Sequence, residues 1–96
     1  MKHIKVNLWL KVENNNKFVR GKKRAREEIE SLILSRYDMK KIRKDGCEYE
    51  LTIPYESDED LDDTIYDMLD EIESMAELRY CFTESDVRDM DSERSW

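Results

Sequence analysis

Residues 37–55, YDMKKIRKDGCEYELTIPY, have the pattern of two strands joined by a tight turn. Asp45-Gly46 is a strong signal for a two-residue hairpin turn, because both positions accept a positive φ. The strand before it, residues 37–44, is rich in lysine, which suits the edge of a sheet. The strand after it, residues 47–55, alternates apolar and polar side chains, so one face of the hairpin belongs to a core. The inward set comprises Cys47, Tyr49, Leu51, Ile53 and Tyr55.

The segments on either side of this hairpin complete a strand and helix order. Residues 3–13 alternate as a half-buried strand, and residues 21–36 have the apolar spacing of an amphipathic helix. Ser57 is a typical N-cap for a second helix, and a last strand is predicted over residues 78–83. The order is β-α-β-β-α-β, which predicts an α+β, ferredoxin-like fold: a four-stranded sheet with two helices on one face.

The last strand and the tail carry two further predictions. Residues 84–96 are polar and without period, so they are predicted to be a frayed tail after a single domain of residues 1–83. Strand parity places Cys47 in the core and Cys81 on the open face, and their spacing matches no zinc site. Reduced thiols would fit a reducing cytoplasm. The predicted inward residues of the last strand are Leu78, Tyr80 and Phe82.

The charge of the chain is divided between its halves. Residues 1–46 contain 14 Lys and Arg against 6 Asp and Glu, a balance of +8, and residues 47–96 contain 3 against 18, a balance of −15. The net charge of −7 hides this asymmetry. Such a division indicates an electrostatic partner, or two oppositely charged surfaces on one protein.

The predicted second helix, residues 57–75, is acidic on the side opposite its apolar face. Asp62 and Glu73 lie at one edge of that side, and no basic residue occurs between positions 59 and 73. Like charges one helical turn apart cost roughly 0.2–0.5 kcal/mol per pair. The negative charge of this face is not balanced within the helix. It therefore indicates a cation from outside the helix, supplied by a partner or by the chain's own basic half. The candidate partner-binding residues are Glu59, Asp60, Asp63, Asp67, Asp70 and Glu71.

A basic stretch over residues 17–26 is the alternative site. Its cations run into a helix N-terminus and could hold an anion or a nucleic-acid backbone. A solvated loop that balances the acidic half of the chain would explain the same residues. The alternative anion-binding residues are Lys17, Arg20, Lys22, Lys23, Arg24 and Arg26.

No catalytic, metal or cofactor site is predicted. His3 is the sole histidine, and the two glycines, Gly21 and Gly46, form no phosphate-binding loop. The carboxylates that begin the second helix fail as a calcium loop, because Asp63 stands where glycine is needed and Leu69 where the closing glutamate is needed. No apolar run approaches 18 residues, so a cytoplasmic protein without a membrane partner is expected.

These features favour a non-enzymatic binding protein. In the first interpretation, the acidic helix imitates nucleic-acid phosphate and occupies the basic groove of a nucleic-acid-handling protein. In size and charge the chain resembles small acidic inhibitors of phages and mobile elements, such as anti-restriction and anti-CRISPR proteins. The second interpretation is a nucleic-acid-binding or regulatory module that uses the basic stretch, alone or as a homodimer through the open sheet face. Direct nucleic-acid binding is less favoured, because Glu48 and Glu50 would repel phosphate from that face.

Overall fold

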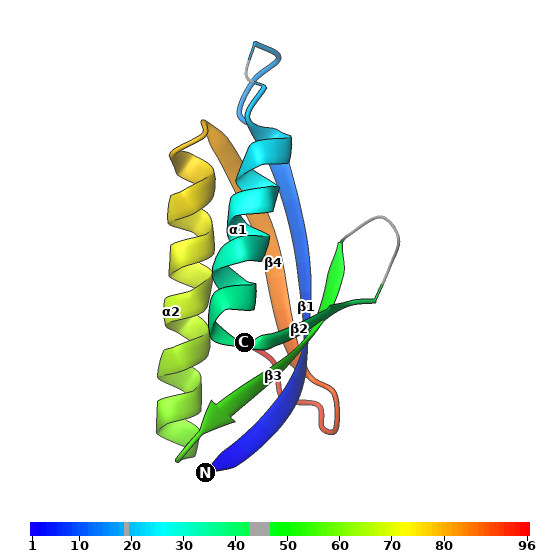
Figure 1. Ribbon diagram of the computed structural model, residues 1–96, viewed down its shortest axis with the longest axis vertical. Helices are drawn as coiled ribbons and strands as arrows, with labels where there is room; N and C mark the ends of the chain where they lie inside the picture. Colours follow the sequence, from blue (N-terminus) through cyan, green and yellow to red (C-terminus); the bar gives the residue numbers. More distant parts are fainter. Residues whose placement is uncertain (19, 43–46) are drawn as a thin grey trace.

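The computed structural model describes residues 1–18, 20–42 and 47–96. Within these ranges the chain forms four strands and two helices in the order β-α-β-β-α-β (Figure 1). The strands are β1 (Lys2–Asn14), β2 (Asp38–Lys41), β3 (Glu48–Tyr55) and β4 (Cys81–Asp89), and the helices are α1 (Lys22–Arg36) and α2 (Asp58–Glu77).

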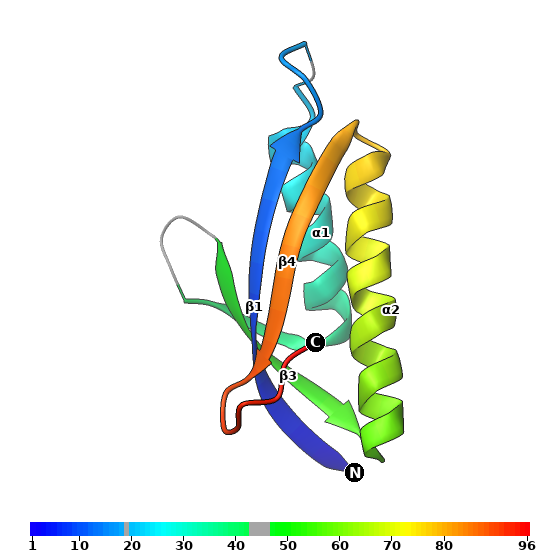
Figure 2. The same cartoon turned by 180° about the vertical axis from the view of Figure 1, so that it is seen from behind.

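The strands form one antiparallel sheet in the order β2-β3-β1-β4. Both helices cover the same face, and the strands stand in front when the molecule is seen from behind (Figures 1 and 2). This arrangement confirms the predicted ferredoxin-like fold. The predicted Asp45-Gly46 turn and the end of the predicted strand 37–44 lie outside the described residues, but β2 and β3 pair as a hairpin requires, with Met39 opposite Leu51.

The core lies between the sheet and the helices. The alternation of β1 and β3 is confirmed, because their inward apolar residues are almost all fully buried. α1 contributes a narrow stripe of Ala25, Ile29 and Ile33, while Leu32 is half-buried at its margin. α2 contributes the widest apolar face: Leu61, Ile65, Met68, Ile72 and Ala76.

α2 begins where the sequence predicts. The Ser57 hydroxyl accepts a hydrogen bond from the backbone N–H of Asp60 at 3.1 Å, which satisfies one of the unpaired donors of the first turn. Three acidic residues occupy that turn, where the helix dipole favours negative charge. The helix continues to Glu77, two residues beyond the predicted end.

The last strand differs from the prediction in its start and its parity. Residues 78–80 form the turn that reverses the chain after α2, so β4 begins only at Cys81. Cys81 and Val87 therefore face the helices and are buried. The first half of the strand predicted over residues 78–83 is therefore this turn. The prediction failed because the spacing of apolar residues does not by itself locate the end of a helix. The residues predicted to face inward are instead exposed: Leu78 (78%), Tyr80 (70%) and Phe82 (45%).

The prediction of a frayed tail over residues 84–96 is also wrong. Residues 84–89 complete β4 opposite β1. Beyond them, the backbone N–H of Trp96 donates to the Val87 carbonyl at 2.9 Å, and the Trp96 indole Nε1 donates to Asp62 Oδ1 at 2.7 Å. The ring packs against the core. Contacts made by one terminal residue leave no periodic signal in a polar segment.

The two cysteines form no disulfide, and their exposure is the reverse of the prediction. Cys81 is 1% exposed, and burial raises the pKa of its thiol, whereas Cys47 is half-buried. Because the thiolate is the reactive species, we expect a thiol reagent to modify Cys47 at least about tenfold faster than Cys81 in the folded protein. Mass spectrometry of labelled peptides measures both rates. Denaturant should equalise the rates, and equal rates before unfolding would contradict the burial of Cys81.

Candidate functional site

Six carboxylates form a row along the solvent side of α2. All six are exposed, and they lie opposite the buried face of the helix. At 1.5 Å of rise per residue, the row extends over about 27 Å. We call this set the acidic row: Glu59, Asp63, Asp67, Asp70, Glu73 and Glu77.

Among the described residues, no Lys or Arg forms an ion pair with a member of the acidic row. Within residues 1–18, 20–42 and 47–96, none of its six side chains makes a hydrogen bond or an ion pair. The other carboxylates of the helix are engaged: Asp58 pairs with Arg94 at 3.5 Å, and Asp62 accepts the Trp96 hydrogen bond. The unpaired charges are therefore segregated on one face.

Two of the predicted partner-binding residues, Asp60 and Glu71, make contacts within the fold. Asp60 Oδ2 accepts a hydrogen bond from the backbone N–H of Glu56 at 3.0 Å, so this predicted residue acts in the helix start. Glu71, also predicted, pairs with Arg36 of α1 at 2.7 Å and raises the pKa of that guanidinium. The acidic row adds two residues to the predicted set: Glu73, which was placed at the edge of the acidic side, and Glu77, which lies beyond the predicted helix end at residue 75.

Two cations of the alternative basic site, Lys22 and Arg26, make contacts within the fold. Lys22 Nζ pairs with Glu13 Oε2 at 3.3 Å, across the end of β1. Arg26 is half-buried, and its guanidinium donates to the Tyr49 hydroxyl at 3.1 Å and to the Leu10 carbonyl at 3.3 Å. Arg26 is therefore a structural residue between α1 and the sheet. Four of the predicted cations remain exposed and form no ion pair among the described residues: Lys17, Arg20, Lys23 and Arg24.

In the part of the chain that the structure describes, no cation of the basic stretch forms an ion pair with the acidic row. The direct ion pair between α1 and α2 in the described structure joins Arg36 to Glu71, outside the row. Arg79, just after α2, pairs with Glu28 of α1, which lowers the pKa of that carboxyl and leaves the row unchanged. The interpretation of the acidic face as internal charge balance is therefore not supported by these contacts.

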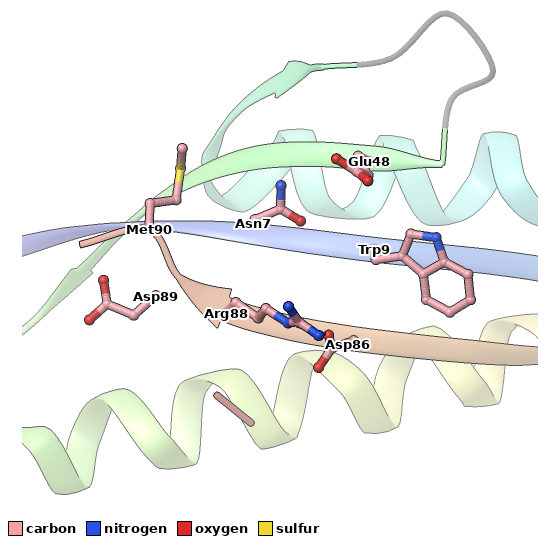
Figure 3. A pocket seen from close by; sticks show the side chains of 7 residues that line it. All are labelled: Asn7, Trp9, Glu48, Asp86, Arg88, Asp89 and Met90. Carbon is pink, nitrogen blue, oxygen red and sulfur yellow. Dashed lines mark hydrogen bonds and ion pairs between the residues drawn. The ribbon is translucent and has the colours of Figure 1, made fainter. Parts of the chain in front are cut away.

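The open sheet face has a hollow of about 600 Å³ beside Trp9 (Figure 3). Trp9 lies in register between Glu48 of β3 and Asp86 of β4, and Asp86 pairs with Arg88 at 2.8 Å. A nucleobase could stack on the indole, but the flanking carboxylates oppose its phosphates. No histidine, cysteine or serine lines the hollow, whose side chains are Asn7, Trp9, Glu48, Asp86, Arg88, Asp89 and Met90.

No protein-family model, curated protein or solved structure matches the chain. In the described part of the chain, no group of three or more His, Cys, Asp or Glu side chains is placed to hold a metal ion. None of the described helices is long and apolar enough to cross a membrane. A functional proposal therefore depends on the surface geometry of this chain itself.

Proposed function

We propose that the chain is a non-enzymatic binding protein whose acidic row occupies the cationic groove of a nucleic-acid-handling protein. The observation that carries this proposal is the segregation of charge on α2. Six carboxylates face solvent and form no ion pair within the described part of the chain, while their neighbours Asp58, Asp62 and Glu71 have partners. A surface that served solubility alone would gain stability from interspersed lysines.

The spacing of the acidic row suits a phosphate-binding groove. Six charges over about 27 Å correspond to about one per 5 Å, against one per ~3.4 Å along each strand of B-DNA. The row is presented by a rigid helix whose opposite face is anchored in the core, so little ordering is needed on binding. Complementary charge also speeds the encounter with a basic groove. An inhibitor of a nuclease or a restriction enzyme would act in this way.

Capture experiments test the proposal. The immobilised chain should retain basic nucleic-acid-binding proteins from a nuclease-treated lysate, and duplex DNA should displace them because both ligands occupy one groove. Retention should also fall steeply as salt rises, since exposed charges are screened over about 8–10 Å at physiological ionic strength. Mass spectrometry of the eluted proteins measures both effects. Partners that DNA does not displace and salt does not release would contradict the proposal.

Direct nucleic-acid binding through the basic stretch is the weaker candidate. Two of its six cations, Lys22 and Arg26, have internal partners, and Arg20 donates to the carbonyl of Lys17 within its own loop at 3.0 Å. A labelled oligonucleotide separates the two candidates. Tight binding of the isolated chain to the oligonucleotide would favour the basic stretch over the acidic row.

A further inference from the structure

Three large apolar side chains are exposed together at one end of the molecule. The loop between β1 and α1 meets the turn between α2 and β4 there, at one end of the longest axis (Figure 1). Phe18, Leu78 and Tyr80 are 82%, 78% and 70% exposed, and they line one hollow of about 400 Å³ with Arg20, Gly21 and Arg79. We call Phe18, Leu78 and Tyr80 the apolar tip.

The backbone holds the two segments of the tip together. The N–H of Asn15 donates to the carbonyl of Tyr80 at 3.0 Å. Gly21 lies so close to the turn that a Cβ in its place would be 2.5 Å from the Arg79 carbonyl oxygen. Tyr80 has a φ of 58°, a conformation in which a bulky side chain is uncommon and glycine is usual. The exposed ring is thus kept at a position that backbone conformation alone would assign to glycine.

The segment that carries Phe18 is rich in cations. Residues 14–26 contain six Lys and Arg and no carboxylate. Lys17 Nζ lies 5.2 Å from the centre of the Phe18 ring, and Lys23 and Arg24 are exposed in the first turn of α1. Exposed aromatic and aliphatic side chains beside a cluster of cations suit the surface of an anionic bilayer, where the lipid headgroups are negatively charged and the layer beneath them is apolar.

We propose that the apolar tip is a peripheral membrane contact that inserts Phe18, Leu78 and Tyr80 into the surface of an anionic bilayer. Lys17, Arg20, Lys23 and Arg24 then face the lipid headgroups. This contact uses residues outside the acidic row and is independent of the function proposed above. It concerns the membrane surface alone and involves no spanning segment.

The shape and the charges favour a flat lipid surface over a nucleic-acid strand. The molecule measures 45 × 26 × 24 Å, and the tip is at one end of the long axis, so a planar surface can be met end-on. Along α2, only Glu77 adjoins the tip, and the other members of the acidic row lie about 6–27 Å further back. Much of that range exceeds the ~8 Å screening length at physiological salt. A strand would need stacking rings in series, whereas Leu78 offers none.

Vesicle sedimentation tests the contact. The full chain should bind vesicles of phosphatidylcholine with phosphatidylserine, bind those of phosphatidylcholine alone more weakly, and dissociate as salt rises. Leu78→Ser should lower the partition coefficient by about tenfold or more, from the loss of a buried leucyl side chain. Leu34→Ser is the matched control, because Leu34 is 60% exposed on α1 and away from the tip, and it should leave binding unchanged.

Tyr80→Gly separates a binding role from a structural one. Glycine suits the positive φ, so this variant should unfold at the same or a higher temperature and yet bind anionic vesicles more weakly. Each of three results would overturn the proposal: no preference for phosphatidylserine, an equal loss in Leu34→Ser, or tip-dependent binding of a single-stranded oligonucleotide without vesicle binding.

Discussion

The double variant Asp63→Lys with Asp67→Lys is expected to lose at least about 100-fold in affinity for the captured partner. Each reversal removes an attraction to a basic groove and adds a repulsion there. Like charges brought together at an interface cost several kcal/mol, and about 2.8 kcal/mol corresponds to 100-fold. Titration of the purified partner by calorimetry or fluorescence anisotropy measures the change.

The fold should tolerate this double reversal. Asp63 and Asp67 are exposed one helical turn apart, and neither side chain has an ion pair or hydrogen bond among the described residues. Lysine at position 63 follows Glu59 by four residues, which is the favourable order for an oppositely charged pair. The melting temperature should therefore be unchanged or higher, so weaker binding cannot be attributed to unfolding.

A matched control separates local charge from net charge. Asp91→Lys with Glu93→Lys changes the net charge by the same amount, and both residues are exposed beyond β4. This control should keep most of the affinity, because the altered side chains lie off the acidic row. If both double variants weaken binding equally, the partner responds to overall charge, and the acidic row is not the binding surface.

The sequence was sufficient to predict the fold wherever a pattern repeated over many residues. The alternation of β1, from Ile4 to Val12, and the helical spacing of α2, from Leu61 to Ala76, each bury one face and leave little choice of register. The solvent side of α2 was predicted for the same reason. Once α2 is a helix with a known apolar face, the positions of Asp63, Asp67 and Asp70 follow from geometry.

The errors arise where one contact decides the structure. β4 begins later than predicted because residues 78–80 form a turn. The sequence does not indicate this turn, since Tyr80 has a positive φ at a position where glycine is the usual residue. Glu71 pairs with Arg36 of α1, and Trp96 is held by its hydrogen bond to Asp62. Such pairs join distant parts of the chain, so local periodicity does not reveal them.

Tyr49→Ala is expected to cost about 3–5 kcal/mol of folding free energy, as truncation of a fully buried aromatic ring does. Tyr49 is 0% exposed in β3, beneath α1. Its hydroxyl donates to Glu30 Oε1 at 2.7 Å and accepts from Arg26 Nη1 at 3.1 Å, so the variant also removes the link between these two charged groups. Thermal unfolding followed by circular dichroism should show a melting temperature at least about 12 °C lower.

Tyr49→Phe isolates the hydroxyl from the ring. It keeps the packing, and it should cost about 1–3 kcal/mol, because Glu30 and Arg26 lose a buried partner. Burial and the Glu30 carboxylate raise the pKa of Tyr49 far above its ordinary value of about 10. Its contribution to stability is therefore complete below pH ~10 and is lost as the pH rises toward the folded-state pKa.

The alkaline loss of stability should therefore be smaller in Tyr49→Phe than in the wild type. Tyr66 supplies the control for both substitutions, since its ring is 54% exposed on the outer side of α2 and Tyr66→Ala should change stability by no more than about 0.5 kcal/mol. If Tyr49→Phe matched the wild type in both stability and alkaline response, the bonds among Tyr49, Glu30 and Arg26 would contribute nothing. Arg26 would still donate to the Leu10 carbonyl at 3.3 Å, so its position between α1 and the sheet would not depend on Tyr49.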